Sequence, residues 1–208
     1  MDLISFNRHE VTSDRWSRQD RELALGLLKT DPLYSRIPEN EIPGLIESAL
    51  ISGEKNAQKI AARFDCKDPL RIARMMNIRV IFDISRNYSR GGINILSTFI
   101  PNPATITVFE NRLRICREKL AGVEDLDRVF LTNLTNICVA HELYHHIERK
   151  CLDFINLKCK VVVFNIKFVK LEKSLSMLSE IAANAFTSEL LGLPVLPSVI
   201  HDKLLIGA

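Results

Sequence analysis

The pattern of hydrophobic and polar residues begins with helical periodicity. Apolar residues three and four positions apart predict one helix after Trp16 and a second over residues 42–51, which ends at Gly53. Residues 54–64 and 69–76 predict a pair of short helices. The second of these opens with an Asp-Pro step, which suits an N-cap followed by proline in the first turn. We therefore expect this part of the chain to be helical.

The pattern then changes to short β-branched runs, which are typical of strands. The runs cover residues 78–84, 93–100 and 104–109, and they are separated by Gly-Gly and Pro-Asn-Pro. Short connections between consecutive strands favour antiparallel pairing. The sequence therefore predicts a small antiparallel sheet.

Strong helical periodicity returns over residues 128–149. His141 and His145 continue the apolar stripe of this helix, which should face the core. Residues 161–169 alternate in part and indicate another strand. Residues 171–191 indicate a last helix, closed by a following glycine.

These elements predict an α+β fold in two parts. Residues 1–53 form an N-terminal helical accessory segment, and residues 54–208 form a compact domain. In that domain the small antiparallel sheet packs on the helix of residues 128–149, with the last helix beside it. A chain of 208 residues is long enough to bury a core of this kind.

Composition and charge narrow the class of protein. With 47% hydrophobic and 25% charged residues, the chain has the composition of a soluble globular protein. The net charge of +3 is too small to indicate a nucleic-acid partner. No run of apolar residues approaches the length of a membrane span. The first residues, MDLISFNRHEVTSDRW, lack the apolar run of a signal peptide, so we expect a cytoplasmic protein.

The five cysteines include no CxxC pair, and an odd number cannot all pair within one chain. We expect single thiols in a reducing compartment. A redox pair of Cys151 and Cys159 is the alternative. His9 and His201 are isolated near the ends of the sequence, and we expect both to be solvated.

Residues 141–145 read HELYH, which is an HExxH motif. On a helix, residues four apart differ by about 40° in direction and about 6 Å in rise, so the imidazoles of His141 and His145 can reach one ion. Catalytic zinc usually has three protein ligands and a water. Glu142 can then take a proton from that water, which zinc makes more acidic. The alternative is a helix whose two histidines pack against the core.

The last predicted helix can supply the third ligand. Glu180 and Asn184 form an ExxxN pattern, and residues four apart share a helix face. Glu180 could therefore complete a His₂Glu set, and Asn184 could orient a ligand imidazole by a hydrogen bond. Small residues at Ala182, Ala183 and Ala185 would let the two helices approach closely. The alternative for Glu180 is a solvated glutamate on the helix surface.

HELYHH and the later EIAANAFTSELLGLP resemble the ImmA/IrrE family of metallopeptidases. DPLRIARMMNIRVIF is similar to the opening helix and strand of that family, and ATITVFEN to its strand before the active-site helix. The resemblance covers about residues 55–195. It implies a compact zincin-like domain of the gluzincin type in which His141, His145 and Glu180 bind Zn²⁺. Glu142 would then be the general base.

Two features depart from the pattern of the family. Many relatives carry a second glutamate where this chain has Ala182, and we infer that Glu180 is the ligand because it keeps the ExxxN spacing. The stretch over residues 147–179 is long for the family. Its apolar, strand-like run could reshape a substrate cleft.

Three further features have weaker claims to a role in the site. The direction of His146 differs by about 100° from that of His145, so we expect a surface or partner-facing role for it and not ligation. Tyr144 could donate a hydrogen bond to a tetrahedral oxyanion, although packing is its expected role. The basic run over residues 112–117 is expected to be a solvated strand or loop, with contact to an acidic partner as the alternative.

The resemblance also implies a function. Members of the family cleave or inactivate helix-turn-helix repressors of mobile-element or stress genes. The expected activity is therefore zinc-dependent hydrolysis of a peptide bond in a protein substrate, a DNA-binding repressor. No direct contact with nucleic acid and no membrane partner is expected.

Two other functions remain as alternatives. The first is a non-catalytic, zinc-containing interaction module that regulates a transcription factor. Glu142 argues against it, because a purely structural site needs no base beside an open position. The second is a DNA-binding regulator with a helix-turn-helix over residues 54–77. That pair of helices lacks a clear glycine turn and a concentrated basic face.

Overall fold

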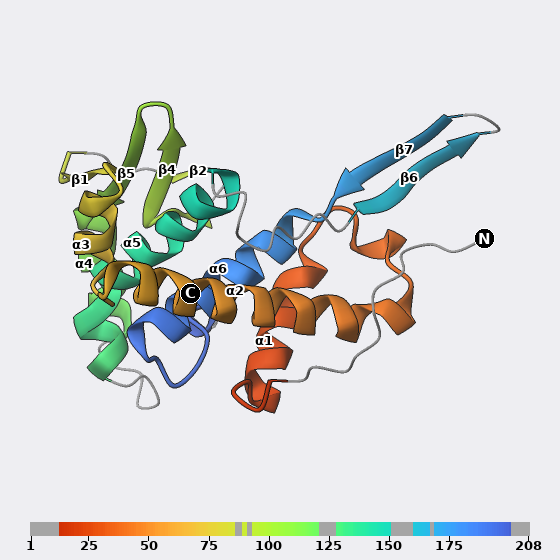
Figure 1. The fold of residues 1–208 in the computed structure, drawn as a ribbon, viewed down its shortest axis with the longest axis horizontal. Helices are drawn as coiled ribbons and strands as arrows, with labels where there is room; N and C mark the ends of the chain where they lie inside the picture. Colours follow the sequence, from red (N-terminus) through yellow and green to blue (C-terminus); the bar gives the residue numbers. More distant parts are fainter. Residues whose placement is uncertain are drawn as a thin grey trace.

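Three helices form the centre of the structure: α2 (Ile42–Phe64), α5 (Arg128–Lys150) and α6 (Ser176–Leu191). The computed structural model describes residues 13–85, 89–90, 93–120, 128–150, 160–166 and 169–200. α6 packs against both α2 and α5, as Figure 1 shows. Residues 181–188 of α6 are all buried, which is the burial expected for a helix that carries few charged side chains. α6 ends at Gly192, which has a left-handed backbone and closes the helix as predicted.

Gly53 lies within α2 at a point where α6 approaches closely. A Cβ atom added at this position would lie 2.7 Å from both the Cβ of Ala185 and the backbone nitrogen of Phe186. It would also overlap the carbonyl oxygen of Ala182. Any larger residue at position 53 would therefore push the two helices apart. The small residues of α6 thus allow a close approach to α2, whereas the sequence predicted one to the helix of residues 128–149.

The continuous helix α2 changes the prediction for the N-terminal part of the chain. The predicted end of a helix at Gly53 is wrong, because α2 continues to Phe64. Residues 54–64 are the second half of α2 and not a separate helix. An interior glycine costs a helix only about 1 kcal/mol relative to alanine, so favourable packing can outweigh it. The predicted division between residues 53 and 54 falls inside this helix.

Two buried carboxylates join the part of the chain before α2 to α6 and to the segment that follows α6. α1 (Arg18–Lys29) follows Trp16 as predicted, and η1 (Tyr34–Arg36) and η2 (Glu39–Glu41) lead from it to α2. Asp31 accepts hydrogen bonds from the backbone nitrogen of Met177, at 3.0 Å, and from the Ser176 hydroxyl, at 3.2 Å. It thereby caps the N-terminus of α6, whose own N-cap residue provides no side-chain hydrogen bond. Asp20 accepts a hydrogen bond from the backbone nitrogen of Leu196, at 2.9 Å.

A three-stranded sheet covers one side of α5. It consists of β1 (Arg79–Asp83), β5 (Ala104–Phe109) and β4 (Ser97–Pro101), in the order β1-β5-β4. β4 and β5 pair antiparallel, as predicted, but β1 and β5 pair parallel. The prediction of a purely antiparallel sheet is therefore wrong. The reason is that β5 returns between β1 and β4, so the neighbour of β1 runs in the same direction. The fold class is α+β with a small mixed sheet.

Two short helices flank this sheet. α3 (Pro69–Met75) begins after Asp68, whose side chain accepts hydrogen bonds from the backbone nitrogens of Leu70 and Arg71. α4 (Glu110–Leu120) follows β5 directly and contains the basic run over residues 112–117. The predicted strand or loop is thus wrong for that run. Its apolar residues Leu113 and Cys116 are three apart and buried, which is helical spacing.

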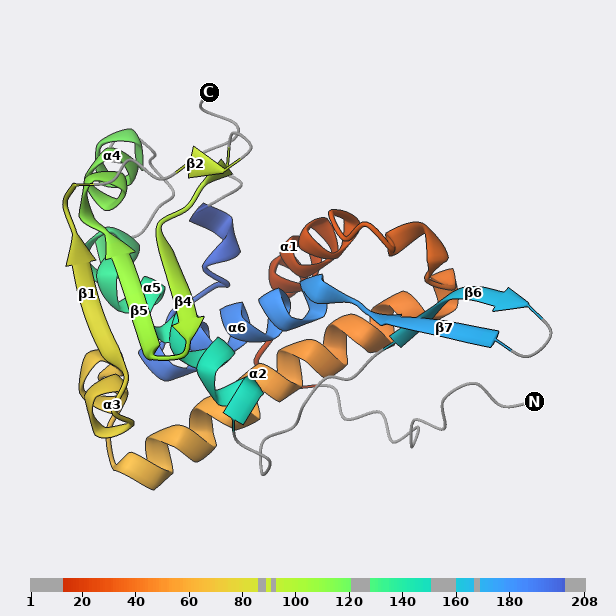
Figure 2. The same ribbon diagram turned by 90° about the horizontal axis from the view of Figure 1, so that it is seen from above.

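Two hairpins complete the described structure. β2 (Ser89–Arg90) and β3 (Ile93–Asn94) form a short one. β6 (Lys160–Ile166) and β7 (Val169–Ser174) form a longer one, which projects from the N-terminal end of α6 away from the sheet (Figure 2). The sequence predicted one strand over residues 161–169 and a helix from residue 171. The structure instead forms two strands, and α6 begins only at Ser176, because the run VKLEKS alternates with the period of a strand.

No helix within the described ranges is both long and apolar enough to cross a membrane. Three cysteines of the described residues are free thiols, as predicted: Cys66, Cys116 and Cys138. The remaining predictions for cysteine and isolated histidine fall on Cys151, Cys159, His9 and His201, which lie outside the described residues.

Candidate metal centre

Side chains from α5 and α6 converge in one cluster. The Nε2 atom of His141 lies 3.1 Å from Oε2 of Glu180 and 3.3 Å from Nε2 of His145. Nε2 of His145 lies 3.3 Å from Oε1 of Glu180. The three predicted ligands therefore meet, although 39 residues separate His141 from Glu180. These groups could hold a metal ion.

The two helices position this cluster in different ways. His141 and His145 are one turn apart on α5, so their rings lie side by side, with centroids 5.0 Å apart. Glu180 lies in the second turn of α6, close to the end that Asp31 caps. The side chains of His141, His145 and Glu180 are 23%, 18% and 35% exposed. The cluster is therefore partly buried between α5 and α6 but accessible to solvent.

His145 is contacted on its other ring nitrogen as well. The hydroxyl oxygen of Ser179 lies 3.4 Å from Nδ1 of His145, and Oε2 of Glu148 lies 3.8 Å from the same atom. Burial alone would lower the pKa of His145, but the carboxylates of Glu148 and Glu180 outweigh it and raise the pKa to about 10. Burial alone would raise the pKa of Glu180, and the hydrogen bonds from His141 and His145 hold it well below its usual range.

Glu142 is turned towards the sheet and is held by Ser97. Its Oε1 atom accepts a hydrogen bond from the Ser97 hydroxyl of β4, at 2.8 Å, and the residue is only 8% exposed. Two residues further along β4, the Phe99 ring meets the His146 ring edge to face, with centroids 5.4 Å apart. Ser97 and Phe99 are alternate residues and share one face of β4. Glu142 and His146 are one turn apart and share one face of α5, so each of the two strand residues meets one of the two helix residues. This contact fixes the rotation of α5 against the sheet.

His146 and Tyr144 differ from their predicted surroundings. His146 does not join the ligand cluster, as expected, but it is buried against Phe99 and not on the surface. Tyr144 is fully buried and packs against Phe186, with ring centroids 5.6 Å apart. Burial and the nearby carboxylate of Glu148 raise the pKa of Tyr144, against the opposing effect of Ser52 and Asn56 of α2. The side chain thus packs in the core, as expected, and has no exposed surface from which to contact an oxyanion.

Asn184 does not make the hydrogen bond that the sequence predicted. Its Nδ2 atom donates to the backbone carbonyl oxygen of Glu180, at 2.8 Å, one turn earlier in α6. The side chain is therefore engaged with its own helix instead of orienting an imidazole. The groups beside the imidazole of His145 are those of Ser179 and Glu148.

Ser97, Glu148 and Ser179 are the site residues that the sequence analysis missed. Glu148 had a usable signal, because it lies three residues after His145 and so on the same face of the helix. Ser179 directly precedes Glu180 and had no distinguishing spacing. Ser97 could be found only from the docking of the sheet on α5.

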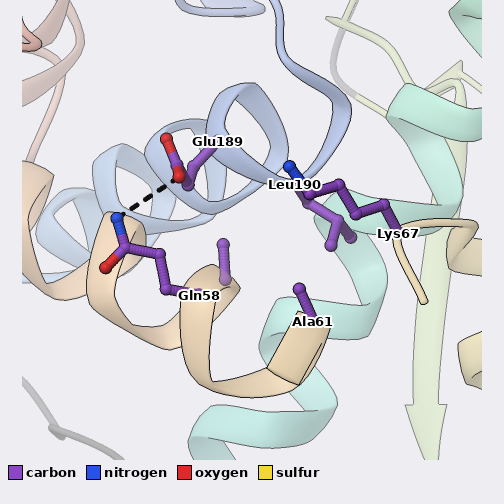
Figure 3. Close-up of a pocket in the computed structure, with 6 residues that line it drawn as sticks. Gln58, Ala61, Lys67, Glu189 and Leu190 are labelled. Carbon is purple, nitrogen blue, oxygen red and sulfur yellow. Dashed lines mark hydrogen bonds between the residues drawn. The ribbon is translucent and has the colours of Figure 1, made fainter. Parts of the chain in front are cut away.

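A shallow pocket of about 210 Å³ lies elsewhere on the molecule. Gln58 and Ala61 of α2, Glu189 and Leu190 of α6, and Lys67 line it, and the Gln58 amide donates to Glu189 across it, at 3.3 Å (Figure 3). Glu189 is nine residues from Glu180, which is about 13 Å along a helix. The pocket is thus separate from the cluster and contains none of its groups.

Comparison with known proteins gives no assignment: no protein-family model, no curated protein and no solved structure matches the chain.

Proposed function

We propose that this chain is a zinc-dependent peptidase with a zincin-like catalytic domain. The observation that carries the proposal is the convergence of His141, His145 and Glu180 on one point, with Glu142 on the adjacent face of the same helix. HExxH supplies two imidazoles and a base, and Glu180 supplies the carboxylate of a His₂Glu set.

The spacing of the donor atoms is compatible with zinc. Zinc binds imidazole nitrogen at about 2.0–2.1 Å in tetrahedral geometry, which places any two ligand atoms about 3.3–3.4 Å apart. The three separations in the cluster are 3.1, 3.3 and 3.3 Å. An ion could therefore be accommodated with little movement of the side chains. A zinc held by His141, His145 and Glu180 could also accept a water or a substrate oxygen.

Glu142 is the group that would move the proton. When bound, zinc would supply a Lewis acid that polarises a carbonyl group and makes water more acidic. Glu142 would accept the proton of the attacking water and return it to the leaving amine. Ser97 donates to one carboxylate oxygen of Glu142, which restricts the carboxylate and leaves its other oxygen for this transfer.

The substrate class follows from the sequence resemblance alone. The proposed substrate is a helix-turn-helix repressor that this peptidase would cleave to relieve repression. Incubation of the zinc-loaded protein with a candidate repressor, preferably one encoded nearby, tests this part. Cleavage fragments that are absent with Glu142→Gln are the expected result. A repressor that stays intact after long incubation would argue against this substrate without affecting the metal site.

The experiment that tests the metal site is a measurement of bound zinc by mass spectrometry. We expect about one zinc per wild-type chain and loss or strong weakening in His141→Ala and Glu180→Ala. Glu189→Ala is the matched control, because it removes a carboxylate from the same helix outside the cluster and should keep its zinc. A folded wild-type protein that binds no zinc after reconstitution would reject the proposal.

The alternative function is a zinc-containing interaction module without turnover. It shares the metal site, so zinc content cannot separate the two functions. Peptide-bond cleavage by wild type and its absence in Glu142→Gln favour the peptidase. Tight binding of a partner that is equal in both proteins, without cleavage, would favour the interaction module.

A further inference from the structure

We infer that Glu148 positions the His145 imidazole for metal binding through the hydroxyl of Ser179. This inference rests on the proposed zinc site and concerns the ring nitrogen that does not face the ion. Ser179 and Glu148 belong to different helices, α6 and α5, so the contact also joins the two helices that supply the ligands.

The direction of each hydrogen bond in this group follows from the number of protons available. The Ser179 hydroxyl lies 2.6 Å from Oε2 of Glu148 and 3.4 Å from Nδ1 of His145. A hydroxyl has one proton, and an ionised carboxylate can only accept. Ser179 therefore donates to Glu148 and must accept from the Nδ1–H of His145. The order is imidazole, hydroxyl, carboxylate.

This order prepares His145 for an ion. A neutral imidazole with its proton on Nδ1 has a free lone pair on Nε2, which can bind an ion. In His145, Nε2 is the atom that faces His141 and Glu180. The hydrogen bond also fixes the plane of the ring. Metal-bound histidines in general donate their second N–H to a carboxylate, a carbonyl or a water. In this chain the hydroxyl of Ser179 bridges to the carboxylate.

Two other roles for Glu148 are less compatible with the geometry. Glu148 faces Nδ1, on the opposite side of the ring from the cluster, so it is not a fourth ligand. It is also not a solvated surface group, because its side chain is only 15% exposed and holds the Ser179 hydroxyl at short range. Removal of Ser179 would leave Glu148 3.8 Å from Nδ1, beyond an ordinary hydrogen bond.

The test is the zinc dissociation constant, measured by competition with a chelator, for wild type, Glu148→Gln, Ser179→Ala and the double variant. We expect each single variant to bind zinc about 10- to 100-fold more weakly. Because the two residues act in series, the double variant should bind within about threefold of the weaker single variant. A purely electrostatic effect of Glu148 would instead leave Ser179→Ala close to wild type, and that result would overturn the inference.

Two further measurements separate positioning from a loss of structure. Ser179→Thr keeps a hydroxyl and should recover most of the affinity, and Glu118→Gln, on the exposed face of α4, should bind zinc as wild type does. In zinc-loaded wild type, proton NMR should show the Nδ1–H of His145 protected from exchange, and Ser179→Ala should lose this protection. Wild type that binds zinc while both single variants bind it within twofold would reject the positioning role alone. Wild type without zinc would reject the metal site as well.

Discussion

On α5, the direction of each side chain decides which neighbour it meets. Successive residues turn by about 100°, so His141 and His145 share the side that faces α6. Glu142 and His146 turn to the sheet, where they meet Ser97 and Phe99. The motif thus places the proposed ligands and the proposed base on adjacent faces of one helix, and Ser97 of β4 holds the proposed base.

The separation of ligand and base predicts that Glu142→Gln will affect catalysis without affecting metal content. Glutamine keeps the size of the side chain but cannot accept the proton from water. Cleavage should fall by about 10²- to 10⁴-fold, the usual contribution of a general base. Bound zinc, measured by mass spectrometry, should stay at the wild-type level. A variant with full activity would show that another group accepts the proton.

Tyr144→Phe is the control for that measurement. Tyr144 is fully buried against Phe186, so its hydroxyl has no route to a substrate. The variant should keep both zinc and activity. A loss of activity comparable to that of Glu142→Gln, in a variant of normal stability, would restore the oxyanion role for this residue.

The pKa of His145 leads to a prediction about pH. In the metal-free protein Glu148 and Glu180 raise this pKa to about 10, against the lowering effect of burial, so the ring is cationic at neutral pH. An ion must displace that proton, because it binds the neutral imidazole. Between pH 6 and about 8, zinc affinity should therefore rise by about tenfold per pH unit. Calorimetry in buffers of different ionisation enthalpy should detect release of about one proton per zinc. Binding without proton release would contradict the prediction.

The cluster of His141, His145 and Glu180 could be predicted from the sequence because both patterns lie within single helices. HExxH and ExxxN fix which side chains share a face before any tertiary structure is known. The contact of Ser97 with Glu142 spans 45 residues and depends on how the strand docks, so no local pattern contains it. Asn184 shows the opposite case. Its spacing was correct, but the backbone of its own helix offers its amide a nearer acceptor.

Among the elements, the contact between α2 and α6 determines where Glu180 lies. α6 is buried among α1, α2 and α5, and Gly53 allows it to lie directly against the backbone of α2. Glu180 precedes the contact residue Ala182 by only two positions. A displacement of α6 would therefore move the ligand relative to His141.

Gly53→Ala is expected to destabilise the fold despite the higher helix propensity of alanine. Alanine gains about 1 kcal/mol in a helix, but its methyl group would overlap the carbonyl oxygen of Ala182. Overpacking of this kind typically costs about 1–3 kcal/mol, and here the neighbours are backbone atoms that cannot rotate away. The two effects together should lower the free energy of unfolding by about 1 kcal/mol, and by up to about 2 kcal/mol. Urea unfolding followed by the fluorescence of Trp16, the single tryptophan, measures it.

Gly44→Ala serves as the matched control for Gly53→Ala. Gly44 lies in the same helix, and a Cβ atom there would meet no atom within 4 Å. The substitution should therefore be neutral or stabilise the protein by up to about 1 kcal/mol. Equal effects of the two substitutions would show that α2 and α6 are not in close contact at Gly53.

The elements themselves were predicted unevenly, for physical reasons. The helix over residues 128–149 was found within one residue of α5, because an apolar stripe over six turns is a strong local signal. The sequence predicts a helix end at Gly53 because the role of this glycine depends on α6, more than 120 residues away. The parallel pairing of β1 with β5 depends on the order of the strands in the sheet. The periodicity within a single strand does not encode that order.

For the whole molecule, residues 13–53 are part of the scaffold of the candidate site. Asp31 caps α6, and Asp20 bonds to the backbone of Leu196 beyond the end of α6. Trp16 and Leu28 belong to the same hydrophobic core as Tyr144 and Phe186. The contacts of Asp31 and Asp20 thus lie near the two ends of α6, the helix that carries Glu180. Residues 54–208 alone would therefore expose a surface of α6 that the intact chain buries.

A chain comprising residues 54–208 is consequently expected not to fold cooperatively. The truncation removes the Asp31 cap, worth about 1–2 kcal/mol, and the burial of Trp16 and Leu28, worth about 2–3 kcal/mol each. It also cuts α2 at its contact with α6. The sum approaches the total stability of a typical domain, about 5–15 kcal/mol. Circular dichroism during urea unfolding should show a broad or absent transition, whereas Asp31→Ala in the full chain should unfold cooperatively at a lower urea concentration. A sharp transition and wild-type zinc affinity for residues 54–208 would instead establish an independent catalytic domain and make the N-terminal segment a true accessory.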